Sequence, residues 1–377
     1  MNVALLISGG VDSAVACYQL VSHGIKPDLW YIKIGSDKNE TLTCAAEEDI
    51  EMASAVANKF GLKLNVIDLH KEYWTHVVNY TMSKVKEGLT PNPDVMCNQL
   101  IKFGAFIDKI GHKYDRIATG HYGRIYRGEH PFLIEETLDN FSQLIGKVWL
   151  GTASDKIKDQ TDFLCTLNEY QLSKLLLPIG SLTKEQVRKI ADEHHLAPAH
   201  RKDSQGICFL GKINYTDYVK QYCGEQEGDV IDIHTNRVLG KYKGYWFYTV
   251  GQRKGLGFGG GPWYVYKKDV KNNIVYVTNN QSDLTASYLQ INTDTLHWFN
   301  NANDILCFNY NPVNVRIRHT DKPSYALFER HNNGKMEINV TNDLIVGAAP
   351  GQFCVIYDND KRVVLGCAEL DYANTKF

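Results

Sequence analysis

Residues 1 to about 200 alternate short apolar runs with longer amphipathic stretches. The apolar runs have the length and composition of buried strands and occupy residues 2–7, 29–34, 64–69 and 116–120. Between and after them, apolar positions recur at helical spacing over about 12–23, 44–60, 70–87, 96–110 and 183–195. Strands that alternate with helices of this length indicate a parallel sheet covered by helices on both faces.

Local residues support these predicted boundaries. Gly24 and Gly61 follow the first two predicted helices, at the position where a helix commonly ends on a glycine. Residues 183–186 (TKEQ) have the capping-box pattern with which many helices begin. Residues 125–157 do not continue the alternation, and we expect a variable connection there with at least one strand.

The pattern changes after about residue 211. Short runs with period-two alternation are typical of antiparallel strands and occupy residues 230–233, 245–250, 314–319, 325–329, 336–340 and 353–358. We therefore predict an α/β protein of three domains. A Rossmann-like parallel-sheet domain spans 1–209, a small mostly-β domain spans 210–280, and a closed or nearly closed β-barrel spans 281–377.

Composition places the chain among soluble globular proteins. Of 377 residues, 44% are hydrophobic and 22% charged, and no apolar run approaches the roughly 18 residues that span a bilayer. The apolar N-terminus lacks the basic region and cleavage site of a signal peptide, so we expect a cytoplasmic protein with no membrane partner. Because the formal net charge is −2, any surface for nucleic acid has to be a local patch.

Nine cysteines are distributed along the chain. Their number is odd and no CxxC pair occurs, so we expect neither a disulfide framework nor a structural zinc site. Most of the thiols are predicted to be small core residues in a reducing cytosol. A reactive thiol has to be recognised by its surroundings.

A glycine-rich turn, SGGVDS (8–13), joins the first predicted strand to the first predicted helix. It lies at the carboxyl end of a strand, where parallel sheets bind ligands. The glycines let an anion approach the backbone, and the N–H groups at the helix start favour negative charge. Ser8 and Ser13 add hydroxyl donors, and Asp12 is placed to hold Mg²⁺ against phosphates. The turn is not a Walker A loop, since it lacks the phosphate-binding lysine, and a glycine turn without a ligand is the alternative.

A proline-containing loop, TPNPDVMCN (90–98), runs into a predicted helix and carries the first candidate cysteine. A thiol near a helix N-terminus has its thiolate stabilised by the helix dipole, so Cys97 is a candidate nucleophile. Asp94, three residues earlier, is a candidate acid or base for a substrate carbonyl or thiol. A buried, unreactive cysteine at a helix start is an equally good local interpretation.

The second candidate cysteine, Cys208, lies in RKDSQGICF (201–209). The basic residues Arg201 and Lys202 favour a thiolate, and Gly206 indicates an exposed turn. The alternative is a core cysteine packed beside its apolar neighbours. On local residues alone, the two interpretations stand level.

Together these segments resemble the tRNA-specific 2-thiouridylase family (MnmA/TrmU), within the PP-loop ATP pyrophosphatase superfamily. SGGVDS matches the superfamily signature, and the other matching segments follow in family order over almost the whole chain: TPNPDVMCNQLIKF (90–103), ATGHYGR (118–124), KDQTDFL (158–164), LPIG (177–180), DSQGICFLG (203–211), YTVGQRKGLG (248–257) and APGQF (349–353). The chain departs from the family pattern at Leu6, where glycine is usual, at Asp162, where an aromatic residue is usual, and over 125–157.

The resemblance implies a sulfurtransferase that adenylates the C2 oxygen of a tRNA wobble uridine and releases AMP and pyrophosphate. Cys208 would carry the sulfur as a persulfide, Cys97 would be the partner nucleophile in a Cys97–Cys208 disulfide, and Asp94 the acid or base. ATP and Mg²⁺ are the implied cofactors. The implied partners are tRNA and a cysteine desulfurase or persulfide carrier protein. Free sulfide and direct persulfide attack on C2 both stay open.

The resemblance also assigns binding residues. The implied ATP site consists of Leu6, Ile7, Ser8, Gly9, Gly10, Val11, Asp12, Ser13, Ile32 and Gly120. The implied tRNA contacts are Asn92, Pro93, Asp94, His121, Lys158, Asp159, Gln160, Arg316, Ile317 and Gln352. A target base in an anticodon stack has to be extruded to reach such a site.

Two other interpretations stay open. Another PP-loop adenylating enzyme, of the lysidine, GMP or NAD synthetase type, would not need both Cys97 and Cys208. A tRNA-binding protein that has lost its chemistry would release no pyrophosphate from ATP when tRNA is added.

Overall fold

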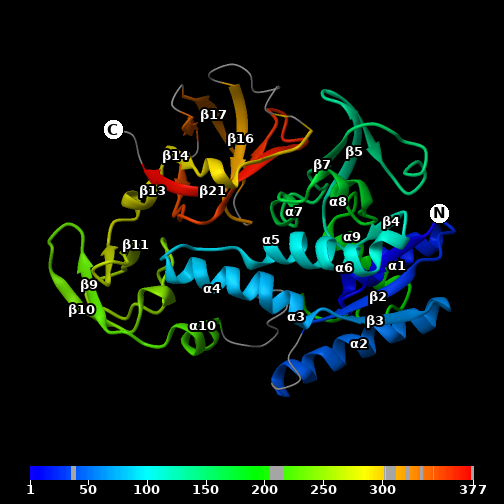
Figure 1. Cartoon of the computed structure of the whole chain (residues 1–377), viewed down its shortest axis with the longest axis horizontal. Helices are drawn as coiled ribbons and strands as arrows, with labels where there is room; N and C mark the ends of the chain where they lie inside the picture. Colours follow the sequence, from blue (N-terminus) through cyan, green and yellow to red (C-terminus); the bar gives the residue numbers. More distant parts are fainter. Residues whose placement is uncertain are drawn as a thin grey trace. The chain divides into compact units, whose positions relative to one another are not determined.

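The structure is a computed structural model that describes residues 1–34, 40–203, 215–300, 302, 311–319, 322–331, 334–342 and 344–374. The chain divides into two compact units, which can be followed by colour in Figure 1. The first unit comprises Met1–Val77, Pro93–Ile213 and Arg362–Val364. The second unit comprises Val78–Asn92, Asn214–Lys361 and Leu365–Phe377.

A parallel sheet forms the centre of the first unit. Its strands lie in the order β3 (Leu64–Asp68), β2 (Asp28–Lys33), β1 (Val3–Leu6), β4 (Arg116–Ala118) and β8 (Leu175–Leu176). All neighbouring pairs are parallel, as the alternation of apolar runs and amphipathic stretches predicts. The chain leaves β1 towards β2 on one side and returns to β4 on the other. Parallel sheets bind ligands at the carboxyl ends of strands where the order reverses in this way.

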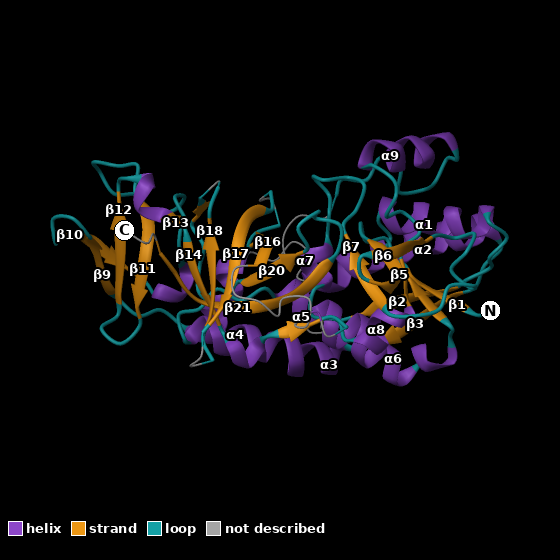
Figure 2. Ribbon diagram, turned by 90° about the horizontal axis from the view of Figure 1, so that it is seen from above, coloured by secondary structure: helices purple, strands orange, loops and turns teal. Residues whose placement is uncertain are grey.

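Helices cover both faces of this sheet (Figure 2). Helices α1 (Val11–Ser22), α2 (Glu40–Phe60) and α9 (Lys184–Glu193) lie on one side, with α3 (His70–Tyr73) and α6 (Phe106–Lys109) on the other. Apolar side chains of α1, α2, α9 and β1 share one core. Helix α9 begins with the predicted capping box: the Thr183 hydroxyl accepts from Gln186 N at 3.2 Å, and the Gln186 side chain accepts from Thr183 N at 2.8 Å.

Two of the predicted helices are regular only in part. The other α- and π-helical segments among the described residues are a π-helix at Trp74–Val78, α4 (Asn79–Lys86), α5 (Pro93–Cys97), a π-helix at Asn98–Ala105, α7 (Thr161–Leu164), α8 (Glu169–Lys174) and α10 (Tyr215–Cys223). A side chain of α8 holds the second π-helix, because Gln171 Nε2 donates to the carbonyls of Gln99 and Phe103, each at 2.9 Å.

The variable connection holds a small antiparallel sheet of its own. Strand β5 (Arg124–Glu129) pairs with β6 (Phe132–Glu136) on one side and β7 (Val148–Gly151) on the other. The sequence predicted at least one strand in this stretch, and the structure has three.

The second unit contains a four-stranded sheet. Its order is β10 (Val238–Tyr242), β9 (Gly228–Asp232), β12 (Ile274–Thr278) and β11 (Tyr264–Asp269). The strand predicted at 245–250 is wrong: Tyr245–Phe247 forms a 3-10 helix. A strand points successive side chains to opposite faces, whereas Tyr245 and Trp246 are both buried.

The second unit also contains a closed six-stranded β-barrel, as predicted. Its strands follow one another in the order β14 (Tyr288–Ile291), β18 (Met336–Val340), β17 (Ser324–Arg330), β16 (Asn311–Arg316), β20 (Phe353–Tyr357) and β21 (Val364–Asn374). Pairing of β14 with β21 closes the ring. Among the described residues, no helix has both the length and the apolar character needed to cross a membrane.

Candidate functional site

The glycine-rich turn lies where the sheet order reverses. Strand β1 ends at Leu6, Ile7 N donates to Trp30 O at 2.9 Å, and α1 begins at Val11 with Gly10 as its N-cap. No side chain caps this helix, so its first N–H groups are available to an anion. Gly9 has a φ of +73°, and a Cβ there would lie 2.4 Å from Asp49 O. Only glycine fits this position without displacing α2.

Hydroxyl groups hold the turn in shape. Ser8 N donates to Ser13 Oγ at 3.2 Å, and Ser13 Oγ donates to Gly10 O at 3.0 Å. The Ser8 and Ser13 hydroxyls are 3.4 Å apart. These contacts fix the turn before any ligand binds, which lowers the ordering cost of binding.

Gly120 lies against the same turn, at the end of the neighbouring strand β4. A Cβ at Gly120 would lie 2.7 Å from Ser13 N and 2.8 Å from Asp12 C. The two predicted nucleotide-binding segments are therefore in direct backbone contact. Ile32, the predicted adenine neighbour, lies in β2 next to β1 and is buried.

The Asp12 carboxylate is paired with two side chains from other parts of the first unit. Lys184 Nζ lies 2.7 and 2.9 Å from its two oxygens, and the Tyr122 hydroxyl donates to Oδ1 at 2.8 Å. Burial and the nearby Asp12 raise the pKa of Tyr122, so the phenol stays protonated as a donor. No local sequence pattern marks Lys184 or Tyr122 as a residue of the site.

Asp203 joins this cluster from the end of the described segment 40–203. Lys184, Lys158 and Arg188 contact its carboxylate at 2.9, 2.9 and 2.5 Å. Burial acts to raise the pKa of Asp203, but the hydrogen bonds and charges of the two lysines outweigh it and hold the pKa well below its usual range. The carboxylate is thus charged, and it anchors three cations beside the turn.

Cys208 lies outside the described residues, and Arg201 and Asp203 are the described residues nearest to it in sequence that contact the site. Arg201 donates to Gly9 O at 3.1 Å and pairs with Asp49 at 2.6 Å. Asp203 is held by Lys184, Lys158 and Arg188. The chain therefore runs past the glycine-rich turn on its way to Cys208.

Cys97 lies one turn inside a helix, not at its start. Helix α5 begins at Pro93, three residues earlier than predicted, with Asp94 in its first turn. The dipole effect fades within the first turn of a helix, so it is a weak source of thiolate stabilisation for Cys97. Asp94 and Cys97 are three residues apart and share one face of the helix. The Cys97 side chain is 1% exposed, so a substrate reaches it only after a local movement.

Two residues of the KDQ segment hold the backbone together. Asp159 is buried and accepts hydrogen bonds from Ala153 N at 2.6 Å and from Thr161 N at 3.1 Å. Gln160 Oε1 accepts from Tyr122 N at 3.0 Å. These three hydrogen bonds stabilise the walls of the site, and contact of these side chains with tRNA stays a prediction.

His121 is a neutral imidazole in this environment. Its Nδ1 lies 2.9 Å from the Thr119 hydroxyl. Desolvation, assisted by the positive charge of Lys102, holds the pKa of His121 well below its usual value. At pH 7 the side chain therefore offers a hydrogen bond and a ring face but no charge.

The other predicted tRNA contacts lie in the second unit. Arg316 and Ile317 are buried, and the Arg316 guanidinium lies 5.4 Å from the centre of the Tyr357 ring. The Gln352 side chain accepts from Ala349 N at 2.9 Å. Asn92 precedes α5. These residues are described within their own unit, and their role in binding tRNA stays a prediction.

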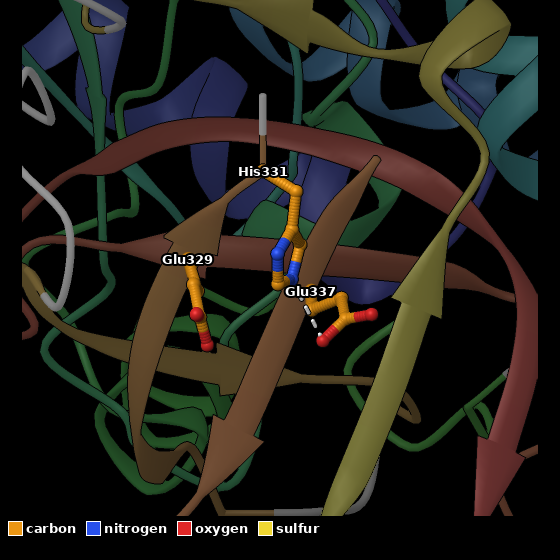
Figure 3. Close-up of side chains that lie close together, drawn as sticks. All are labelled: Glu329, His331 and Glu337. Atoms are coloured by element: carbon orange, nitrogen blue, oxygen red, sulfur yellow. Dashed lines mark ion pairs between the residues drawn. The ribbon is translucent and has the colours of Figure 1, made fainter. Parts of the chain in front are cut away.

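A cluster on a barrel hairpin has the composition of a metal site. Glu329, His331 and Glu337 bring one ligand atom each within 4.8 Å of one another (Figure 3). Protein groups already contact both carboxylates of this cluster, because Tyr288 donates to Glu337 and Asn339 donates to Glu329. His331 Nε2 lies 2.9 Å from Glu337 but, among the described residues, accepts or donates no hydrogen bond. We assign the cluster no metal.

Comparisons with known proteins cover the whole chain. Family models match in sequence order: the tRNA methyl transferase HUP domain over residues 1–212, the tRNA methyl transferase PRC-barrel domain over 216–279 and the aminomethyltransferase β-barrel domain over 289–369. The chain is 46% identical to the tRNA-specific 2-thiouridylase MnmA 1 of Bacteroides thetaiotaomicron, over 98% of this chain and 99% of that protein. It is 47% identical to MnmA 2 of Bacteroides fragilis, over 98% and 100%, and 46% identical to MnmA of Porphyromonas gingivalis, over 97% and 98%.

Similarity to solved structures is remote. A 4-thiouridine synthetase–RNA complex with bound ATP matches with a TM-score of 0.34 and 15% identity, over 58% of this chain and 50% of that one. A likeness at this level carries no argument about the site.

Proposed function

This chain belongs to the tRNA-specific 2-thiouridylase family, and from that premise we propose that it replaces the C2 oxygen of a tRNA uridine with sulfur. The observation that carries the proposal is 46–47% identity with named thiouridylases over nearly the full length of both chains. The chain is accordingly a sulfurtransferase with tRNA as its substrate. We propose the cytoplasm as its location and the wobble uridine as its target.

The turn at residues 8–13 is the proposed ATP site. It supports this role with an uncapped helix N-terminus, two glycines that allow close approach and two cations, Lys184 and Arg201, at its edge. Gly120 lets the end of β4 pack directly against the backbone of the turn, because a Cβ there would lie 2.7 Å from Ser13 N. Mg²⁺ bound with ATP would neutralise phosphate charge, and Asp12 is the carboxylate of the turn that fits it once Lys184 moves away.

ATP is needed because a uridine C2 carbonyl is a poor electrophile whose oxygen leaves badly. In the proposed first step, the uridine oxygen attacks the α-phosphorus and pyrophosphate departs with the electron pair of the broken P–O bond. The oxygen now belongs to AMP, which is a good leaving group. Sulfur then adds at C2 and AMP is expelled with that oxygen.

The proposed sulfur carrier is Cys208, loaded as a persulfide by a cysteine desulfurase or a persulfide carrier protein. The Cys97 thiolate attacks the inner sulfur of this persulfide, a Cys97–Cys208 disulfide forms, and hydrosulfide is released towards C2. A reducing thiol then restores both cysteines. If the outer sulfur of the Cys208 persulfide attacks C2 directly, the same Cys97–Cys208 disulfide forms in a later step. Asp94, on the same helix face as Cys97, is the proposed acid or base.

The experiment that tests this proposal is a thiolation assay. Unmodified tRNA is incubated with the protein, ATP, Mg²⁺ and a persulfide donor, and thiouridine is measured by nucleoside mass spectrometry and gel retardation. Cys97→Ser and Cys208→Ser are expected to abolish product formed from persulfide. Cys223→Ser is the matched control, because Cys223 is partly exposed and lies in the second unit.

Each outcome has a clear meaning. Thiouridine that depends on ATP and on both cysteines supports the proposal. Pyrophosphate release without thiouridine would refute it in favour of another adenylating enzyme. Full activity of the Cys97 or Cys208 variant would remove the two-cysteine relay.

A further inference from the structure

Lys184 is held beside the glycine-rich turn through both its backbone N–H and its ammonium group. Its backbone N–H donates to Asp155 at 2.8 Å, and its Nζ contacts both oxygens of Asp12 and one oxygen of Asp203. The side chain is only 15% exposed. Lys184 is the first residue of α9, whose capping box sets where the helix begins.

This placement brings a cation to the one side chain of the turn that opposes ATP. Asp12 lies in the first turn of α1, where an uncapped helix start attracts anions. A charged carboxylate at that point repels the phosphates of a nucleotide. Lys184 neutralises it with two contacts, and the turn at residues 8–13 contains no lysine of its own.

We propose that Lys184 binds the ATP polyphosphate in this enzyme, moving its ammonium group from Asp12 to the β- and γ-phosphate oxygens when the nucleotide enters. The proposal rests on the proposed ATP-dependent function. When the bond between the α-phosphorus and its bridging oxygen breaks, the electron pair stays on the departing pyrophosphate. The ammonium group stabilises that growing charge by hydrogen bonding, without transferring a proton. The exchange also frees the Asp12 carboxylate.

Other donors to Asp12 and Asp203 lower the free-energy cost of moving the Lys184 ammonium group. Asp12 keeps the hydrogen bond from Tyr122 after Lys184 leaves, so it is not left without a donor. Asp203 keeps Lys158 and Arg188. Neither carboxylate is therefore stranded in a low-dielectric site, which is the main cost of breaking a partly buried ion pair.

The competing explanation is that Lys184 serves only to neutralise Asp12. Binding of the non-hydrolysable ATP analogue α,β-methylene-ATP, measured by calorimetry in EDTA, separates the two explanations. We expect Lys184→Met to weaken binding of this analogue by about tenfold to hundredfold, since a hydrogen bond to a charged group is lost. Binding of AMP, which lacks the β- and γ-phosphates, is expected to change little.

The double variant Asp12→Asn/Lys184→Met decides the question. If Lys184 only cancels the charge of Asp12, removing both charges restores analogue binding to the wild-type affinity, and the proposal is overturned. If Lys184 contacts the phosphates, the double variant stays weak. EDTA keeps a divalent cation at Asp12 out of the comparison.

Two controls keep the result interpretable. Lys189→Met changes a lysine of the same helix that is 74% exposed and pairs with Glu193 at 3.7 Å, and it should bind like wild type. Thermal melting of each variant reports folding. Wild-type affinity in Lys184→Met overturns the inference but leaves the thiouridylase proposal intact. If the wild-type protein binds no ATP analogue, the ATP-dependent function and this inference both fail.

Discussion

Gly9 and Gly24 stand at the two ends of α1 and allow a matched test of the glycine-rich turn. Both have left-handed backbones, with φ of +73° and +77°. A Cβ at Gly9 would lie 2.4 Å from Asp49 O and 2.8 Å from Asp49 Cα, whereas a Cβ at Gly24 meets nothing within 4 Å. Gly9→Ala and Gly24→Ala therefore share the conformational cost and differ in the steric clash.

The magnitudes follow from these two terms. A left-handed alanine costs about 1–2 kcal/mol at either position. The clash at Gly9 involves helix backbone, which cannot rotate away, and overpacking of this kind costs about 1–3 kcal/mol. Gly9→Ala should therefore destabilise the protein by roughly 2–5 kcal/mol and Gly24→Ala by roughly 1–2 kcal/mol. At about 2–4 °C per kcal/mol, the difference between the two melting temperatures is measurable.

Thermal melting and binding of α,β-methylene-ATP are the two assays. Gly9→Ala is expected to melt lower than Gly24→Ala and to bind the analogue more weakly, because relief of the clash displaces the turn. Gly24→Ala should bind like wild type, since it lies at the far end of the helix. Equal melting temperatures, or unimpaired binding by Gly9→Ala, would refute the close packing of the turn against α2.

Two further predictions concern the helical segment next to Cys97 and the partly buried Lys268. Gln171→Leu removes two hydrogen bonds to the carbonyls of Gln99 and Phe103, so urea denaturation should show a loss of about 1–3 kcal/mol. Thiolation should fall more than ATP binding, and unchanged thiolation in a destabilised protein would contradict the link to Cys97. Lys268 lines a cavity of about 370 Å³, and burial lowers its pKa to about 8. Because the unfolded lysine titrates near 10.4, the unfolded chain binds more protons between these values and stability from this group rises with pH. Lys268→Met should therefore melt at a higher temperature than the wild type at pH 7, and this difference should disappear towards pH 10. A difference in melting temperature that persists at pH 10 would contradict desolvation of Lys268 as its source.

The sequence predicts most of the architecture because the decisive patterns are local. Within the run at 2–7, residues 3–7 are continuously apolar, and the strand they predict lies inside a parallel sheet. Strand β8 is not predicted, because it has only two residues. The strand predicted at 245–250 is wrong because adjacent aromatic residues at 245 and 246 are also common in strands. The domain boundaries at 209 and 280 stay predictions.

The candidate site is predictable only where its residues are consecutive. Residues 8–13 form one turn, so composition alone indicates an anion site. Lys184 reaches Asp12 from 172 residues away, and only the fold of α9 across α1 brings them together. The sequence pattern predicts a helix from residue 96 and so puts Cys97 at its start, whereas the helix begins at Pro93. The position of Cys208 relative to Cys97 stays a prediction.

The most direct test of the account follows one oxygen atom. A tRNA whose target uridine carries ¹⁸O at C2 is thiolated by the protein with ATP and a persulfide donor, and the AMP released is analysed by mass spectrometry. Transfer of the C2 oxygen to the α-phosphorus predicts one ¹⁸O atom in AMP for each thiouridine formed. Thiouridine accompanied by unlabelled AMP, with ¹⁸O released into water, would contradict adenylation of the uridine as the activating step.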